Sequence, residues 1–131
     1  MPSRVWSHLC DYATVDASGK ASIMGEFDMI FTPQVPLQYP LFYIAAKWTM
    51  TAEERFDYRV RAIAPSGAEL FITPPHGISG SDGENQILIH AFVGREFLEF
   101  GTYTVEERVD DTPLHAMTLT VQLVRPGQKR G

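Results

Sequence analysis

The N-terminal segment HLCDYATVDASGKASIMGEFDMIF, residues 8–31, carries the side chains best suited to chemistry. His8 and Cys10 lie two residues apart, so on a β-strand they share one face and could supply two ligands to zinc. A structural zinc site needs four ligands. The other histidines follow far along the chain without paired spacing: His76, His90 and His115. We therefore expect no metal site in this segment.

The Gly-Lys pair at residues 19–20 also occurs in the phosphate-binding loop motif. That motif requires a glycine at position 14 and a hydroxyl residue at position 21, where this chain has Thr14 and Ala21. A calcium loop centred on Gly19 would need acids at Thr14 and Gly25. Both motifs fail, so we interpret Gly19 as the positive-φ residue of a hairpin turn.

Cys10 is the one cysteine, and as a nucleophile it would need a base and an oxyanion hole. Its neighbour Asp11 would point to the opposite face of a strand, which favours a buried core thiol. The polar loop SGSDGEN offers oxygen ligands for a weak cation site, with a solvated turn as the alternative: Asp82, Glu84 and Asn85. The sequence shows no converging catalytic set, so we expect neither an enzyme nor a bound cofactor.

Composition sets broader limits. The 131 residues fit one domain, which we place at residues 1–124, followed by a flexible basic tail at 125–131. A net charge of −5 argues against nucleic acid as a partner, because phosphate binding needs clustered lysine and arginine. No segment is typical of a signal peptide or a membrane span, and one cysteine excludes an internal disulfide. These features favour a cytoplasmic protein.

Alternation of apolar and polar residues dominates the chain and predicts strands. The clearest strands are predicted at 21–31, 56–64 and 115–124, and others fit at 5–13, 41–50, 68–73, 86–93 and 102–110. Turns rich in Gly, Pro and Asp separate them, which is typical of an all-β sandwich. We expect an immunoglobulin-like antiparallel β-sandwich of about 7–9 strands. The longer segments 32–40 and 73–86 are predicted to be connections, the first extended because of its prolines.

The stretch EFGTYTV, residues 99–105, predicts a tyrosine corner, in which the Tyr103 hydroxyl bonds to a nearby backbone group. Two positions further along the same strand, Glu107 falls on the apolar face. Burial of an unpaired charge is costly, so we expect a bulge or strand end that turns Glu107 to solvent. The alternative is a buried carboxylate with a basic partner.

Residues 41–50 are apolar on both faces of the predicted strand. Phe42, Ile44 and Trp48 fill one face, while Leu41 and Tyr43 lie on the other. Contiguous exposed apolar patches are uncommon in monomers, so the second face needs a cover. The cover is either one of the two long connections or a second chain, and we favour a homodimer with Leu41 and Tyr43 in its interface.

The hairpin LCDYATVDASGKASIMGEFDMIF, the linker TPQVPLQYPLFYIAAKW and the late FGTYTV strand resemble an uncharacterised family of short bacterial proteins, a domain of unknown function. The resemblance implies a bacterial cytoplasmic sandwich and carries no catalytic residues. The missing catalytic set and the excess apolar surface lead us to expect a non-enzymatic interaction module that self-associates or binds another protein. The alternative is a small-ligand or carbohydrate-binding module with an aromatic platform built from Trp6, Trp48, Tyr39 and Tyr43.

Overall fold

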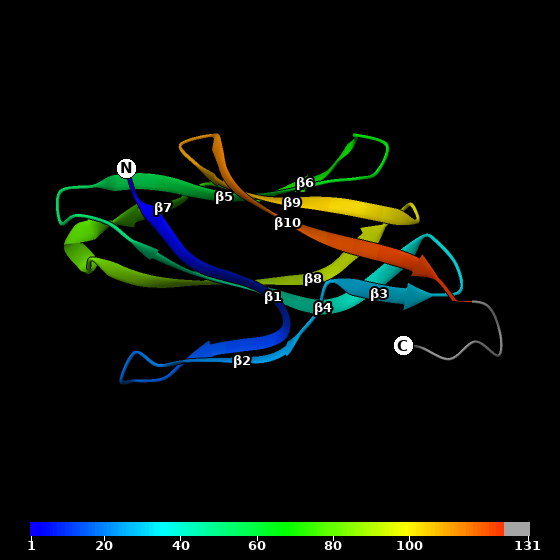
Figure 1. Ribbon diagram of the computed structural model, residues 1–131, viewed down its shortest axis with the longest axis horizontal. Helices are drawn as coiled ribbons and strands as arrows, with labels where there is room; N and C mark the ends of the chain where they lie inside the picture. The colour runs from blue at the N-terminus through cyan, green and yellow to red at the C-terminus, as the bar shows by residue number, and fades with distance from the viewer. Residues whose placement is uncertain (125–131) are drawn as a thin grey trace.

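The computed structural model describes residues 1–124, which form two facing β-sheets and contain no α-helix in that range (Figure 1). No helix within those residues is long and apolar enough to cross a membrane. The predicted basic tail, 125–131, lies outside the described residues. The elements are β1 (Ser3–Val15), β2 (Ala21–Glu26), β3 (Met29–Thr32), β4 (Leu37–Thr49), β5 (Arg55–Ile63), β6 (Glu69–Ile72), β7 (His76–Ser79), the 3₁₀ turn η1 (Gly80–Asp82), β8 (Asn85–Phe97), β9 (Gly101–Val109) and β10 (Thr112–Leu123).

The first sheet has the strand order β2-β1-β4-β8, and the second has the order β3-β10-β9-β5-β6, with β7 also paired to β5. In Figure 1 the strands β5, β9 and β10 lie above β1, β4 and β8. The predicted all-β sandwich is confirmed. Ten strands form within residues 1–124 instead of 7–9, because the short strands β3 and β7 were not expected. The pairing is also not wholly antiparallel, since β3 runs parallel to β10.

The core fills the space between the sheets and follows the predicted alternation most closely in β5. Phe56, Tyr58, Val60 and Ala62 are all buried, with at most 4% of each residue exposed. Opposite them, β4 contributes alternate large side chains, Phe42, Ile44 and Trp48, of which none is more than 1% exposed. Such a closely packed interior provides most of the apolar burial that stabilises the fold.

The predicted single strand at 21–31 is wrong, because the chain changes sheets in its middle. The Phe27 amide still donates to the Leu9 carbonyl of the first sheet, at 3.0 Å. The Asp28 carbonyl already accepts from the Thr120 amide of the second sheet, at 2.9 Å. In the second sheet, Ile30 is buried, whereas Met29 is 41% exposed.

The turn between β1 and β2 has the predicted positive φ at Gly19, which measures 83°. The Asp16 side chain organises the turn, since its Oδ1 atom accepts from the Ser18 hydroxyl, the Ser18 amide and the Lys20 amide at 2.7–3.0 Å. Its hydrogen bonds, led by that from the Ser18 hydroxyl, lower the pKa of Asp16. The Gly-Lys pair therefore belongs to a hairpin turn. The Asp16 side chain and the backbone amides of Ser18 and Lys20 are hydrogen-bonded to each other within that turn.

The predicted bond of Tyr103 to a nearby backbone group is present. Its hydroxyl donates to the Glu99 carbonyl at 2.9 Å and accepts from the Glu99 amide at 3.0 Å. The Tyr103 ring is buried against Phe97 at a centroid separation of 5.2 Å. The side chain thus fixes the loop between β8 and β9 to the core.

Tyr103→Phe is expected to lower the free energy of unfolding by about 0.5–1.5 kcal/mol, the net contribution of a hydrogen bond. The ring stays in place, so the loss reports on the hydroxyl alone. Urea unfolding would measure it, with Tyr12→Phe as the control because the Tyr12 side chain is substantially exposed. Equal stabilities for the two variants would show that the corner contributes nothing.

Glu107 contradicts the expectation that it turns to solvent, because it is fully buried in β9. The Tyr58 hydroxyl donates to Glu107 Oε1 at 2.7 Å, and the Ser7 hydroxyl donates to Oε2 at 2.5 Å. The irregularity in this strand pair lies in β10, between Pro113 and His115, so β9 keeps its alternation and Glu107 faces inward. Burial, followed by the Glu107 carboxyl, raises the pKa of Tyr58 well above its usual range.

The segment at 73–86 is more ordered than the predicted connection. It contains β7, which pairs with β5, and the η1 turn. The Gln86 side chain closes the turn by donating to the carbonyls of Ser79 at 2.7 Å and Gly83 at 2.9 Å. Among residues 1–124 no three side chains of the His, Cys, Asp and Glu types gather as they would around a metal ion, and this holds for Asp82 and Glu84 of this turn.

Candidate interaction surface

The outer face of the first sheet carries partly exposed apolar side chains. Cross-strand register places Leu41 of β4 opposite Val93 of β8, and Tyr43 opposite Cys10 of β1. Residues that alternate with these point into the sandwich. We define the outer patch as the large apolar side chains on this face: Trp6, Tyr12, Leu41, Tyr43, Ile89 and Val93.

A small second core lies beneath the outer patch and is separate from the main core. Cys10, Ala13 and Ala45 are buried there, with at most 4% exposure, and Trp6 and Tyr43 are among the larger side chains packed against them. Small residues at the centre of a sheet face leave space in which larger neighbouring side chains pack over them. The sequence therefore forms an aromatic layer on a face that a monomer would normally present to solvent.

Much of the outer patch remains in contact with water. Val93 is 73% exposed, Tyr12 is 45% exposed and Leu41 is 40% exposed. The rings of Tyr12 and Tyr43 meet edge to face at a centroid separation of 5.3 Å, which fixes their orientation. Aromatic side chains held in this way lose little conformational entropy when a partner binds.

Neither of the two long connections covers this patch. The predicted connection at 32–40 is shorter than expected, because β4 begins at Leu37; Val35 of the connection and Leu37 and Tyr39 of β4 pack against the main core. The segment at 73–86 pairs through β7 with the second sheet. The internal cover considered from the sequence is thus not found among residues 1–124.

The edge of the first sheet lies next to the patch. β8 has 13 residues and, within the part of the chain that the structure describes, pairs only with β4. Its stretch from residue 85 to residue 93, NQILIHAFV, contains no proline, lysine, arginine or carboxylate. Natural edge strands usually carry such residues because an unpaired edge is a template for pairing with another chain.

Cys10 and His8 do share a face, as expected, but they are in different environments. Cys10 is fully buried, and burial raises the pKa of its thiol, which opposes formation of a nucleophilic thiolate. His8 is partly exposed, and its Nδ1 atom lies 2.5 Å from Glu26 Oε1. The pair therefore forms part of the patch and its rim instead of a reactive centre.

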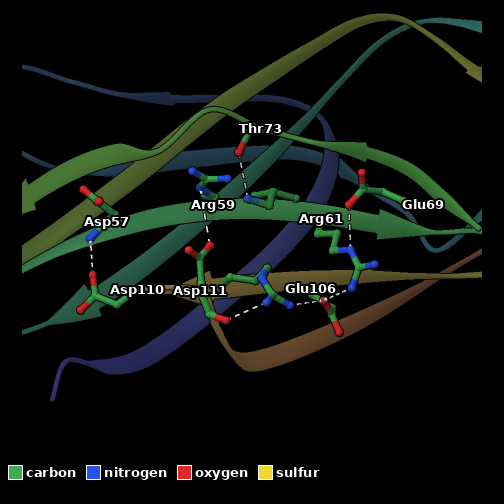
Figure 2. A network of polar contacts seen from close by, with 10 residues as sticks. Asp57, Arg59, Arg61, Glu69, Thr73, Glu106, Asp110 and Asp111 are labelled. Carbon is green, nitrogen blue, oxygen red and sulfur yellow. Dashed lines mark hydrogen bonds and ion pairs between the residues drawn. The ribbon is translucent and has the colours of Figure 1, made fainter.

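The outer face of the second sheet is charged (Figure 2). Arg61 pairs with Glu69 at 2.9 Å and with Glu106 at 3.7 Å, and Arg108 also binds Glu106 at 2.9 Å. Arg59 and Asp111 extend this network toward the turn between β9 and β10. Exposed ion pairs contribute little stability each, about 0–1 kcal/mol, but they keep this face hydrophilic.

The chain matches a family model described as "Family of unknown function (DUF6941)" over residues 5–122. The chain belongs to this family. A comparison with characterised proteins finds no match. A solved structure with a similar fold is the Pseudomonas fluorescens alkylpurine DNA glycosylase AlkC bound to DNA containing an abasic site analog, with 10% identity and a TM-score of 0.51. The likeness covers 72% of this chain and only 27% of that one, so it supports the fold alone.

The aromatic platform predicted for a ligand-binding role is not assembled in this DUF6941 protein. Trp48 is fully buried in the main core, and Tyr39 packs against that core beside Phe97. Of the four predicted residues only Trp6 and Tyr43 lie on the outer patch. A cavity of about 420 Å³ beside β5 and β7 is lined by none of the patch residues.

Sequence reasoning singled out Leu41 and Tyr43, and it recognised two apolar faces on the first strand, but it missed Val93 as part of the same surface. The pattern that would have revealed Val93 lies in β8, where apolar residues occur on both faces of the strand. Leu88 and Phe92 are buried, while Ile89 and Val93 lie on the other face. Contiguous exposed apolar patches of this kind are uncommon on monomeric proteins.

Proposed function

We propose that this protein is a non-enzymatic interaction module that self-associates through the outer patch and the edge of β8. The observation that carries the proposal is the pair formed by Leu41 of β4 and Val93 of the edge strand β8, 40% and 73% exposed, beside the uncharged stretch 85–93 of that edge. Burial of such a surface against a protein is favourable at about 25 cal/mol per Å² of apolar area. Addition of a strand to the β8 edge would supply backbone hydrogen bonds as well.

A second copy of the chain suits this surface. Twofold dimers are the most common assemblies, and an edge strand that pairs antiparallel with its own copy is self-complementary. The net charge of −5 makes two copies repel each other, but acidic residues such as Glu69 and Glu106 lie on the opposite face. Those two carboxylates are paired with arginines, and Glu26 lies beside His8 at the rim of the patch, so the repulsion between two copies is reduced mainly by salt screening.

Tyr43→Glu tests the proposal. We expect light scattering at micromolar concentration to give the mass of two subunits for the native chain and of one subunit for Tyr43→Glu, because the new carboxylate would be desolvated in the interface. Circular dichroism would check that the variant remains folded. Thr118→Glu is the matched control, since it adds the same charge to an exposed position on β10 of the other sheet.

A native chain with the mass of one subunit would remove the proposal. So would a folded Tyr43→Glu variant that keeps the dimer mass, because it would place the interface elsewhere.

A further inference from the structure

His76 of β7 and His90 of β8 approach each other where the two sheets meet at their open edge. His76 Nδ1 lies 3.4 Å from His90 Nε2, and the ring centroids are 5.4 Å apart at an interplanar angle of 67°. This separation exceeds the usual hydrogen-bond distance of about 2.7–3.2 Å. Two nitrogens that each lie about 2.0–2.1 Å from a tetrahedral metal ion are roughly 3.3–3.4 Å apart.

Both rings are held by their surroundings. His90 lies in a paired strand opposite Ile44, and its ring packs on the Tyr58 ring at 5.4 Å. His76 is the strand partner of Tyr58. The Tyr58 hydroxyl is already bonded to Glu107, so the tyrosine supports the histidines without competing for their nitrogens. The His90 ring is thus fixed by packing, whereas His76 is positioned by its strand pairing and its contact with His90.

The chemical state of the pair also suits a metal ion. Burial, followed by the charge of His76, lowers the pKa of His90. Neutral imidazole is the form that ligates metals. His76 is exposed, so an ion could reach the pair from solvent.

We propose that His76 and His90 form a two-nitrogen site for a transition-metal ion of the Zn²⁺, Ni²⁺ or Cu²⁺ class. Within residues 1–124 no third His, Cys, Asp or Glu side chain joins them, so water completes the coordination. β7 belongs to the second sheet and β8 to the first, so a bound ion links the two layers. Both proposals involve β8, but His90 lies on its inward face opposite Ile44, whereas the outer patch lies on its outward face.

Thermal unfolding of the full chain with ZnCl₂, NiCl₂ or MgCl₂ tests the site. Metal that binds only the folded state at 100 times its Kd raises the ratio of folded to unfolded protein about 100-fold. We expect this effect from Zn²⁺ and Ni²⁺ but not from Mg²⁺, which prefers oxygen ligands. Calorimetric titration should give one ion per chain.

His76→Ala should abolish the metal-induced shift, and its exposed position makes it the safer of the two histidine variants. His8→Ala should keep the shift, since His8 lies on the outer face beside Glu26. The site is disproved if Zn²⁺ leaves the native chain unchanged, if Mg²⁺ acts equally, or if His76→Ala keeps the native response. Loss of the response in His8→Ala would place the ion at the other histidine and also overturn the assignment.

Discussion

Glu107→Ala is expected to lower the free energy of unfolding by about 3–5 kcal/mol. The substitution leaves the hydroxyls of buried Tyr58 and half-buried Ser7 without their acceptor, and an unsatisfied buried donor costs about 1–3 kcal/mol. The removed atoms also leave a cavity at a fully buried position. Urea unfolding followed by tryptophan fluorescence would measure the loss.

Two further variants separate the causes of that loss. Glu107→Gln keeps the shape and one acceptor oxygen, so we expect a smaller loss of about 1–2 kcal/mol. Glu69→Ala removes a partly exposed carboxylate that pairs with Arg61, and it should cost about 1 kcal/mol or less. If Glu107→Ala were no more destabilising than Glu69→Ala, the hydroxyl bonds would not stabilise the core.

Gly80→Ala should have the second largest effect, a loss of about 3 kcal/mol. A Cβ atom at Gly80 would lie 1.8 Å from the Thr51 carbonyl oxygen and 2.8 Å from its carbon. The Gly80 amide also donates to the Glu54 carbonyl at 2.8 Å, so the two backbones cannot separate without losing that bond. Overpacking against rigid backbone costs roughly 1–3 kcal/mol, occasionally more.

The matched control is Gly77→Ala, in β7 just before the same turn. A Cβ atom there would meet nothing closer than Asp57 Oδ1 at 3.8 Å, so we expect a change below about 0.5 kcal/mol. Thermal unfolding of the two variants makes the comparison. Similar melting temperatures would mean that the turn at 80–82 can move away from Thr51, and that the segment 73–86 is not held as described.

Local patterns predicted those parts of the fold that depend on neighbouring residues. The alternation in β5, the positive φ of Gly19 and the backbone bond of Tyr103 all follow from sequence-local rules. The change of sheet at residues 27–28 depends on β10, about ninety residues later in the chain. Alternation cannot reveal which sheet a strand joins, so residues 21–31 were expected to form one strand.

The environment of Glu107 depends on distant partners in the same way. Ser7 comes from the other sheet, one hundred positions earlier in the sequence, and no spacing rule connects the two residues. The expectation of a bulge was reasonable for an unpaired charge, but the partners are hydroxyl groups instead of a basic residue. The apolar residues on both faces of 41–50 could be recognised from the sequence. That β8 lies next to them at the edge of the sheet could not, because it depends on the strand order.

The parallel pairing of β3 with β10 limits how the chain can fold during synthesis. Among the described strands, β3 has β10 as its only sheet neighbour. The first sheet can form once β8 has left the ribosome, but β3 must wait for residues 120–123 before its register is complete. Such non-local closure is slow because the loop entropy is lost before the contact forms. On the ribosome, the nascent chain therefore holds the apolar segment around Ile30 unpaired until β10 emerges.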